Sequence, residues 1–151
     1  MKIVYKTGNL LEDDADILVN CVNDKGLMGA GIALAFKNKF PKMFEDYQLD
    51  CKNRYFDDEC FLIFRNESHI ICNLLTMSDN MKGSYARTIT GLYKLAKHIK
   101  RIPIITSIAI PPCGCGIGGL DKNIIYDVIC EVFKDVGIEL RLYNFEEFNN
   151  A

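Results

Sequence analysis

The chain has 151 residues, of which 49% are hydrophobic and 25% are charged, and its formal net charge is -2 at pH 7. These values predict one globular domain, residues 1–151, with a substantial core, and they exclude a general attraction to polyanions such as duplex DNA. No apolar stretch reaches about 18 residues and the first residues lack the pattern of a signal peptide, so we expect a cytoplasmic protein without membrane contact.

The first half of the chain alternates strand-like and helix-like segments. Residues 2–8 and 16–23 are apolar, β-branched and bounded by turn-forming residues, which predicts two strands. The glycine-rich segment 23–41, NDKGLMGAGIALAFKNKFP, follows. Its part 31–40 has apolar residues at helical spacing with lysines near the C-terminal end, which predicts a helix. Residues 41–53 open with proline and predict a second helix.

The second half of the chain begins with a predicted β-hairpin at 59–76, whose turn is Asn66, Glu67 and Ser68. Beyond it we expect, in order, a polar loop at 77–84, a helix at 85–100, a strand at 103–110, a glycine-rich loop at 111–119, a helix at 123–137 and a strand at 138–145. Asp121 is the expected N-cap of the last helix. This order predicts an α/β fold, a three-layer α/β/α sandwich around a mixed, mostly parallel central sheet.

The seven cysteines are odd in number, and several lie in strand-like runs, which favours buried reduced thiols over a disulfide framework. Cys113 and Cys115 are two residues apart and do not form a CxxC pair, and His69 and His98 are isolated. We therefore expect no metal site, and the sequence indicates no cofactor.

Two glycine-rich loops each follow a strand-like run and precede a helix: LMGAGIA at 27–33 and CGCGIGG at 113–119. Such junctions let backbone N–H groups point at a ligand near a helix N-terminus, where negative charge is favoured, so they commonly bind phosphate. Neither loop ends in GK[ST], and the first lacks the full GxGxxG pattern, which counts against ATP hydrolysis and dinucleotide redox chemistry. One such loop is often only a tight turn, but two favour a diphosphate site.

The segment GNLLEDDADILVNCVNDKGLMGAGIALAFKNKFPKMFEDY (8–47), followed by IPPCGCGIGGLD (110–121), resembles the macro domain family, whose fold binds ADP-ribose. Within that family it is similar to the branch of terminal ADP-ribose protein glycohydrolase and of the antitoxins that remove ADP-ribose from DNA. The resemblance covers residues 2 to about 143. It implies binding of ADP-ribose and hydrolytic removal of ADP-ribosyl or acyl-ADP-ribose modifications from protein or nucleic acid.

The resemblance also implies a set of ligand contacts, all in loops or at strand ends. They are Gly8, Asn9 and Leu10 at the adenine; Asn20, Asn23, Met28, Gly29, Ala30, Gly31 and Ile32 along the diphosphate and distal ribose; Pro112, Gly114, Cys115, Gly116, Ile117 and Gly118 over the phosphates; and Tyr143 and Asn144 near the adenine. Two of these have an alternative interpretation: Asn9 as a residue that shapes the turn, and Tyr143 as an ordinary half-buried strand aromatic.

The chain departs from the branch at the positions that carry catalysis. Glycohydrolases of this branch have a lysine directly after the strand that ends in threonine, but here Met77 follows Thr76. The aspartate that the protein-directed member has in the second glycine loop is replaced here by Gly118. A thioether can neither attack the anomeric carbon nor stabilise charge there, so the lysine's absence removes a named mechanism.

Lys82 and Lys25 are the candidate substitutes for the missing lysine, with Asn23 orienting the distal ribose. Asp79, in the same polar loop as Lys82, is a weaker candidate for a general base. For each lysine the alternative is a solvated surface residue.

Two functions therefore remain: a hydrolase that removes ADP-ribose, and a non-catalytic reader of ADP-ribose, which Met77 favours. The sequence leaves open whether the acceptor is glutamate, thymine, guanine, an acetyl ester or a terminal phosphate. It also leaves open whether the chain pairs with a toxin.

Overall fold

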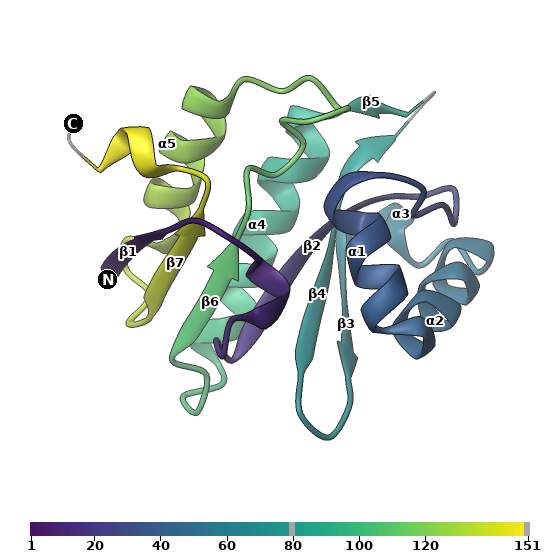
Figure 1. Ribbon diagram of the computed structural model, residues 1–151, viewed down its shortest axis with the longest axis horizontal. Helices are drawn as coiled ribbons and strands as arrows, with labels where there is room; N and C mark the ends of the chain where they lie inside the picture. The colour runs from purple at the N-terminus through teal and green to yellow at the C-terminus, as the bar shows by residue number, and fades with distance from the viewer. Residues whose placement is uncertain (79–80, 150–151) are drawn as a thin grey trace.

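The computed structural model describes residues 1–78 and 81–149, which form a seven-stranded sheet with helices on both faces (Figure 1). The strands are β1 (Lys2–Lys6), β2 (Ile17–Asn23), β3 (Phe61–Arg65), β4 (Ile70–Ser78), β5 (Lys82–Gly83), β6 (Ser107–Ile110) and β7 (Glu139–Tyr143). The helices are α1 (Gly31–Lys39), α2 (Pro41–Lys52), α3 (Phe56–Glu59), α4 (Tyr85–Lys100) and α5 (Lys122–Phe133), with 3-10 turns η1 (Leu10–Glu12) and η2 (Glu146–Phe148). The predicted α/β/α sandwich is confirmed.

The strand order is β1-β7-β6-β2-β4-β3, with β5 paired to the end of β4. Every neighbouring pair from β1 to β4 in this order is parallel, whereas β3 and β5 run antiparallel to β4. The sheet is thus mixed and mostly parallel, as predicted. Since β2 and β6 are parallel neighbours, the two glycine-rich loops that follow them leave the same edge of the sheet.

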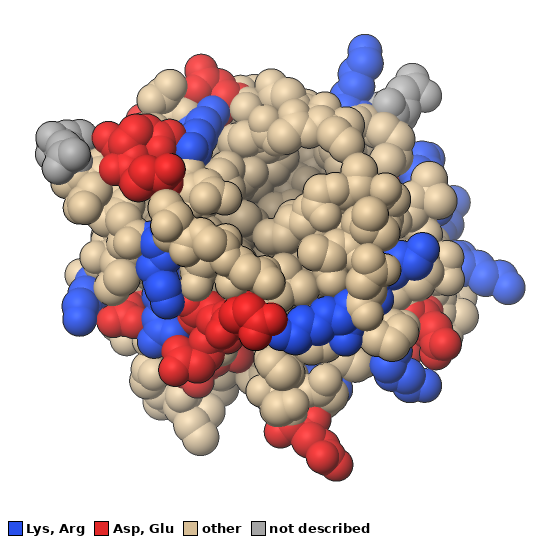
Figure 2. All heavy atoms as spheres, viewed as in Figure 1, with Lys and Arg blue, Asp and Glu red and all other residues tan. Residues whose placement is uncertain are grey.

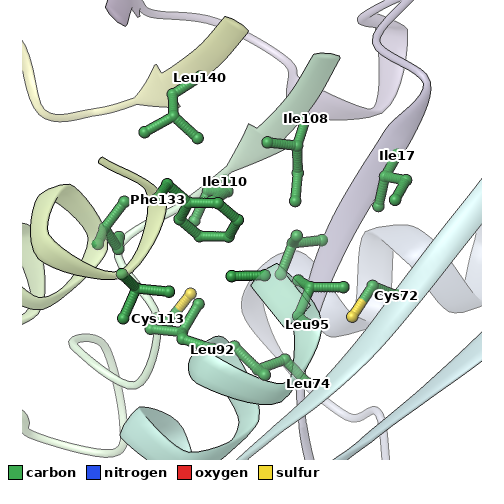
Figure 3. Close-up of a cluster of buried hydrophobic side chains, with 14 of the residues drawn as sticks. Ile17, Cys72, Leu74, Leu92, Leu95, Ile108, Ile110, Cys113, Phe133 and Leu140 are labelled. Carbon is green, nitrogen blue, oxygen red and sulfur yellow. The ribbon is translucent and has the colours of Figure 1, made fainter. Parts of the chain in front are cut away.

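The central strands are buried on both faces, so their alternate side chains enter two different cores. In β2, Ile17 and Val19 belong to the core under α4 and α5, while Leu18 and Val22 belong to the core under α1, α2 and α3. Figure 3 shows the first core, in which Phe133 of α5 lies against strand side chains. This alternation explains why the strands read as continuous apolar runs in the sequence.

Two local predictions about turns and caps are confirmed. The β3–β4 hairpin turns at Asn66–Ser68, where Asn66 Oδ1 accepts hydrogen bonds from the Ser68 and His69 amides at 2.9 and 2.7 Å. The side chain of Asp121 caps α5 by accepting from the Asn123 amide at 2.8 Å.

Other boundaries differ from the prediction. The strand expected at 103–110 begins only at Ser107. The Asp16 carboxylate accepts hydrogen bonds from the Thr106 amide and hydroxyl at 2.7 and 3.1 Å, so that amide does not pair with a neighbouring strand. The last strand and last helix are each shorter than predicted. The elements that were not predicted, α3, β5, η1 and η2, are too short to show a periodicity.

All seven cysteines are free thiols. Within residues 1–78 and 81–149, no helix combines the length and the apolar character that crossing a membrane requires.

A buried carboxylate, Asp13, ties the loop after β1 to β7. Its Oδ2 accepts hydrogen bonds from Lys6 Nζ at 2.8 Å and Tyr143 Oη at 2.5 Å, and its Oδ1 accepts from Arg141 Nη1 and the Ala15 amide at 2.7 Å each. Burial alone would raise the pKa of Asp13, but these hydrogen bonds outweigh burial and hold the pKa well below its usual range. The ionised carboxylate therefore stabilises this edge of the sheet.

We expect Asp13→Asn to lower the free energy of unfolding by about 2 kcal/mol at neutral pH, because Lys6 and Arg141 lose their shared counter-charge. The folded pKa lies below the unfolded one, so the wild type keeps this contribution above about pH 4 and loses it as the pH falls further. Urea unfolding at neutral and acid pH should therefore show the gap between variant and wild type narrowing in acid. Glu131→Gln, which breaks the exposed pair with Lys134, is the control and should change little. A gap that is equal at both pH values would contradict the role given to the charge.

Candidate functional site

A cleft of about 440 Å³ opens at the carboxyl ends of the parallel strands. Its walls come from the end of β2, the start of α1, the end of β4, the β6–α5 loop, the start of α5 and the residue after β7. The lining residues are Cys21, Ala30, Gly31, Ile32, Ala33, Thr76, Met77, Pro111, Pro112, Gly114, Cys115, Gly116, Ile117, Gly118, Lys122 and Asn144. Figure 2 shows the hollow, with walls that are mostly neither acidic nor basic.

One wall of the cleft is the N-terminus of α1. The helix begins at Gly31 with φ +57°, after Ala30 in extended conformation, and no side chain in the described part of the chain caps it. Its first turn contains no acidic residue, while Lys37 and Lys39 lie in its last turn. An uncapped, uncharged helix N-terminus that lines a cleft favours an anionic ligand group there.

The opposite wall is the β6–α5 loop, which backbone hydrogen bonds hold in shape. The Leu120 amide donates to Gly114 O at 2.9 Å, and the Gly83 amide of β5 donates to Gly118 O at 2.9 Å. A Cβ added at Gly114 would lie 2.6 Å from the Leu120 side chain, and one added at Gly118 would lie 2.6 Å from Gly114 O. These two glycines are therefore required by the loop's own packing.

Gly116 in the same loop is different. A Cβ added there would meet no protein atom within 4 Å, and its backbone lies outside the left-handed region. Because Gly116 lines the cleft, an added side chain would project into open space at the cleft.

Three residues of the predicted contact set are buried and absent from the cleft lining: Asn20, Asn23 and Met28. Asn23 Nδ2 donates to Leu27 O at 2.8 Å, and its Oδ1 accepts from the Lys25 amide at 2.9 Å and from Tyr47 Oη at 2.7 Å. The side chain of Asn23 thus holds the turn that carries the loop, and its contact with a ribose stays a prediction.

Asn20 is fully buried, and its Nδ2 donates to Asn73 Oδ1 at 3.1 Å and lies 3.8 Å from the Met28 sulfur. Asn20 and Met28 thus support the first loop from its buried side. Gly29 also lies outside the lining, although its neighbours Ala30, Gly31 and Ile32 line the cleft as the resemblance implies.

At the β1 and β7 end, Asn144 lines the cleft and Tyr143 does not. Tyr143 is buried and donates to Asp13, whereas Asn144 has φ +64°, and its amide donates to Lys6 O at 3.0 Å. A non-glycine residue in the left-handed region often marks a functional site.

The residues expected to contact adenine lie nearby but outside the lining. Gly8 is exposed and has φ +100°. Asn9 Oδ1 accepts from the Leu11 amide at 3.1 Å and caps η1, and Leu10 is buried. This hydrogen bond supports the interpretation of Asn9 as a residue that shapes the turn.

Of the candidates for the missing lysine, Lys25 and Lys82 are both exposed, and neither lines the cleft. Asp79 lies outside the described residues. Met77, the position of the branch's lysine, does line it, beside Thr76.

Sequence reasoning missed four lining residues: Cys21, Ala33, Pro111 and Lys122. Among the residues that the structure describes, Lys122 is the one charged side chain of the lining. Lys122 could have been predicted from the sequence, because it lies three residues after the second glycine loop, in the first turn of α5. The place of Cys21 in the lining can be inferred from the alternation of side chains along β2 only when the strand order is known.

The Cys115 thiol of the cleft is not an ionised nucleophile. Burial raises the pKa of Cys115 to about 11, so the side chain is a neutral thiol at physiological pH. Within residues 1–78 and 81–149 no group of His, Cys, Asp or Glu side chains is arranged to hold a metal ion.

The fold and the cleft define a class: an α/β/α domain with a cleft between glycine-rich loops at the carboxyl ends of parallel strands, the usual place for a ligand in such sheets. The macro domain family model matches residues 19–129, and the chain belongs to this family. The DNA ADP-ribosyl glycohydrolase of Mycobacterium tuberculosis is 34% identical over 139 residues, which are 89% of this chain and 39% of that protein. This chain therefore spans about two fifths of that relative's length.

Two further comparisons, one of sequence and one of structure, also find similar proteins. The ADP-ribose glycohydrolase OARD1 of Homo sapiens is 27% identical over 143 residues, which are 94% of this chain and 91% of that protein. The solved macrodomain of Mycobacterium tuberculosis DarG superposes with a TM-score of 0.87 at 33% identity and covers 93% of this chain and 96% of its own.

Gly116→Val should fold normally and lose affinity for ADP-ribose, the ligand that the resemblance implies, by about tenfold or more, because the isopropyl group would occupy the cleft. Calorimetric titration measures the affinity and thermal unfolding checks the fold. Gly137→Val is the matched control, since a Cβ there also meets no atom within 4 Å but lies outside the cleft. Unchanged affinity in Gly116→Val would exclude this cleft as the binding site.

Proposed function

We propose that this chain binds ADP-ribose and releases it hydrolytically from a modified protein or nucleic acid. The observation that carries the proposal is the cleft between the uncapped N-terminus of α1 and the β6–α5 loop, both at the carboxyl edge of the sheet. The names of the similar proteins, which are glycohydrolases of ADP-ribosylated DNA and of ADP-ribose, support the same function.

The strand order gives the ligand a direction along the cleft. Asn144 follows β7 and Met77 is the second-last residue of β4, and these strands lie on opposite sides of the central pair β6–β2. In the proposal, the diphosphate lies between Ile32 and Gly116, near the central pair. The adenosine extends toward Asn144 and the distal ribose toward Met77, in the direction that the family resemblance implies.

The chemistry at the Met77 end depends on positioning. Among the described residues that line the cleft there is no carboxylate. Water that attacks the anomeric carbon would therefore gain rate mainly from a fixed ribose geometry, with any general base supplied from outside this lining. This same observation favours the second candidate function, a reader that binds ADP-ribose without turnover.

Two measurements on one preparation separate the candidates. Titration with ADP-ribose measures binding, and incubation with ADP-ribosylated protein and with ADP-ribosylated single-stranded DNA measures release. Binding with release supports the hydrolase, binding without release supports the reader, and no binding would overturn both. If release occurs, Lys25→Ala and Lys82→Ala test the two candidate lysines.

Met77→Lys should raise the rate of release by about tenfold or more, because it restores an amine at the position where the resemblance places the branch's lysine. Met77→Gln is the control: its side chain has similar length and is polar but has no amine. A timed release assay under single-turnover conditions compares the three proteins. If Met77→Lys and Met77→Gln release ADP-ribose at equal rates, the amine at this position is irrelevant to this chain.

A further inference from the structure

Lys122 combines two features that no other residue of the described part of the chain shares: it lines the cleft and it carries a charge. It opens α5 directly after Asp121, so the backbone of the second glycine loop and this side chain come from one continuous segment. Its charge also acts on the loop, because it lowers the pKa of Cys115 against the larger opposing effect of burial.

The ammonium group of Lys122 is held on the rim of the cleft by two contacts. Its Nζ lies 2.6 Å from Glu147 Oε1 in η2 and 5.4 Å from the centroid of the Phe145 ring. Phe145 is fully buried and packs against Tyr126 and Phe148, so the aromatic contact is fixed in place.

The partner carboxylate is held less firmly than the ring. The side chains of Lys122 and Glu147 are 32% and 50% exposed, and ion pairs with this much solvent access contribute little net stability. Exchange of Glu147 for another anion therefore costs the protein little. A diphosphate in the cleft carries more negative charge than one carboxylate, and an ammonium–phosphate contact is a charge-assisted hydrogen bond.

We propose that Lys122 contacts the diphosphate of the bound ligand and that Glu147 competes with the ligand for it. The proposal rests on the proposed function, since it assumes ADP-ribose in the cleft. In this arrangement the backbone amides of α1 and the glycine loop hold the diphosphate, and Lys122 adds the one full positive charge of the described lining. Glu147 lowers the affinity for the ligand because, in the protein without ligand, its carboxylate already neutralises the charge of Lys122.

The test compares Lys122→Gln and Glu147→Gln with the wild type by calorimetric titration with ADP-ribose at low and high salt, about 25 and 250 mM. We expect Lys122→Gln to weaken binding about tenfold at low salt and clearly less at high salt, since salt screens the lost contact. Glu147→Gln should have the opposite sign and tighten binding about two- to threefold at low salt.

A matched pair of controls lies on the same helix. Glu131 in the last turn of α5 and Lys134, the C-cap of that helix, also form an ion pair, 2.7 Å between Nζ and Oε1, with both side chains more than half exposed and away from the cleft. Lys134→Gln and Glu131→Gln should leave the affinity unchanged, and thermal unfolding should show all four variants folded.

Three results would overturn the proposal. The first is affinity of Lys122→Gln within twofold of the wild type. The second is an equal loss at both salt concentrations, which would indicate a structural role, and the third is weaker binding by Glu147→Gln. In each case the wild type still binds ADP-ribose and the proposed function stands. A wild type that does not bind ADP-ribose would end the proposed function and this proposal together.

Discussion

The parallel pairing of β2 with β6 is the constraint on which the site depends. Leu18 lies opposite Ala109 in this pair, and both strands point their carboxyl ends at the same edge. The two glycine loops are separated by 79 residues in the sequence (34–112), yet this pairing places them on facing walls of one cleft. A strand inserted between β2 and β6 would move the loops about 5 Å further apart, and they would no longer form one cleft.

The cleft offers a ligand mainly backbone groups rather than charged side chains. Backbone amides bind a ligand well only where the loop that carries them is rigid. Below the first loop, Tyr47 and Asn23 supply that rigidity through buried hydrogen bonds. In the second loop, Leu120 fills the space beside Gly114 and its amide closes the turn. Below the first loop, the residues that shape the loop are therefore distinct from the residues that line the cleft, whereas Gly114 and Gly118 of the second loop do both.

This distinction explains what the sequence could and could not predict. The hairpin at Asn66–Ser68, the Asp121 cap and the glycine loops depend on neighbouring residues, so their local patterns predicted them. The strand order depends on contacts between distant segments, and side-chain direction at the cleft depends on that order. Lys25 and Lys82 therefore attracted attention in the sequence, whereas the structure brings Lys122 to the cleft.

The same dependence applies to the strand residues near the site. Cys21 and Asn20 are adjacent in β2 and so point to opposite faces. Cys21 reaches the cleft, and Asn20 lies in the buried layer next to Met28. The family resemblance implied ligand contacts in and before the first loop but gave no means of deciding which of these residues line the cleft and which are buried beneath it.

In the proposed function, backbone amides of the two loops hold the diphosphate. A titration of the isotope-labelled protein with ADP-ribose, following each backbone amide by two-dimensional NMR, tests this directly. We expect the largest shifts at the amides of residues 31–33 and 114–118, with small changes along α2 and β3. Shifts confined to other surfaces, or none at saturating ADP-ribose, would show that these amides do not hold the ligand.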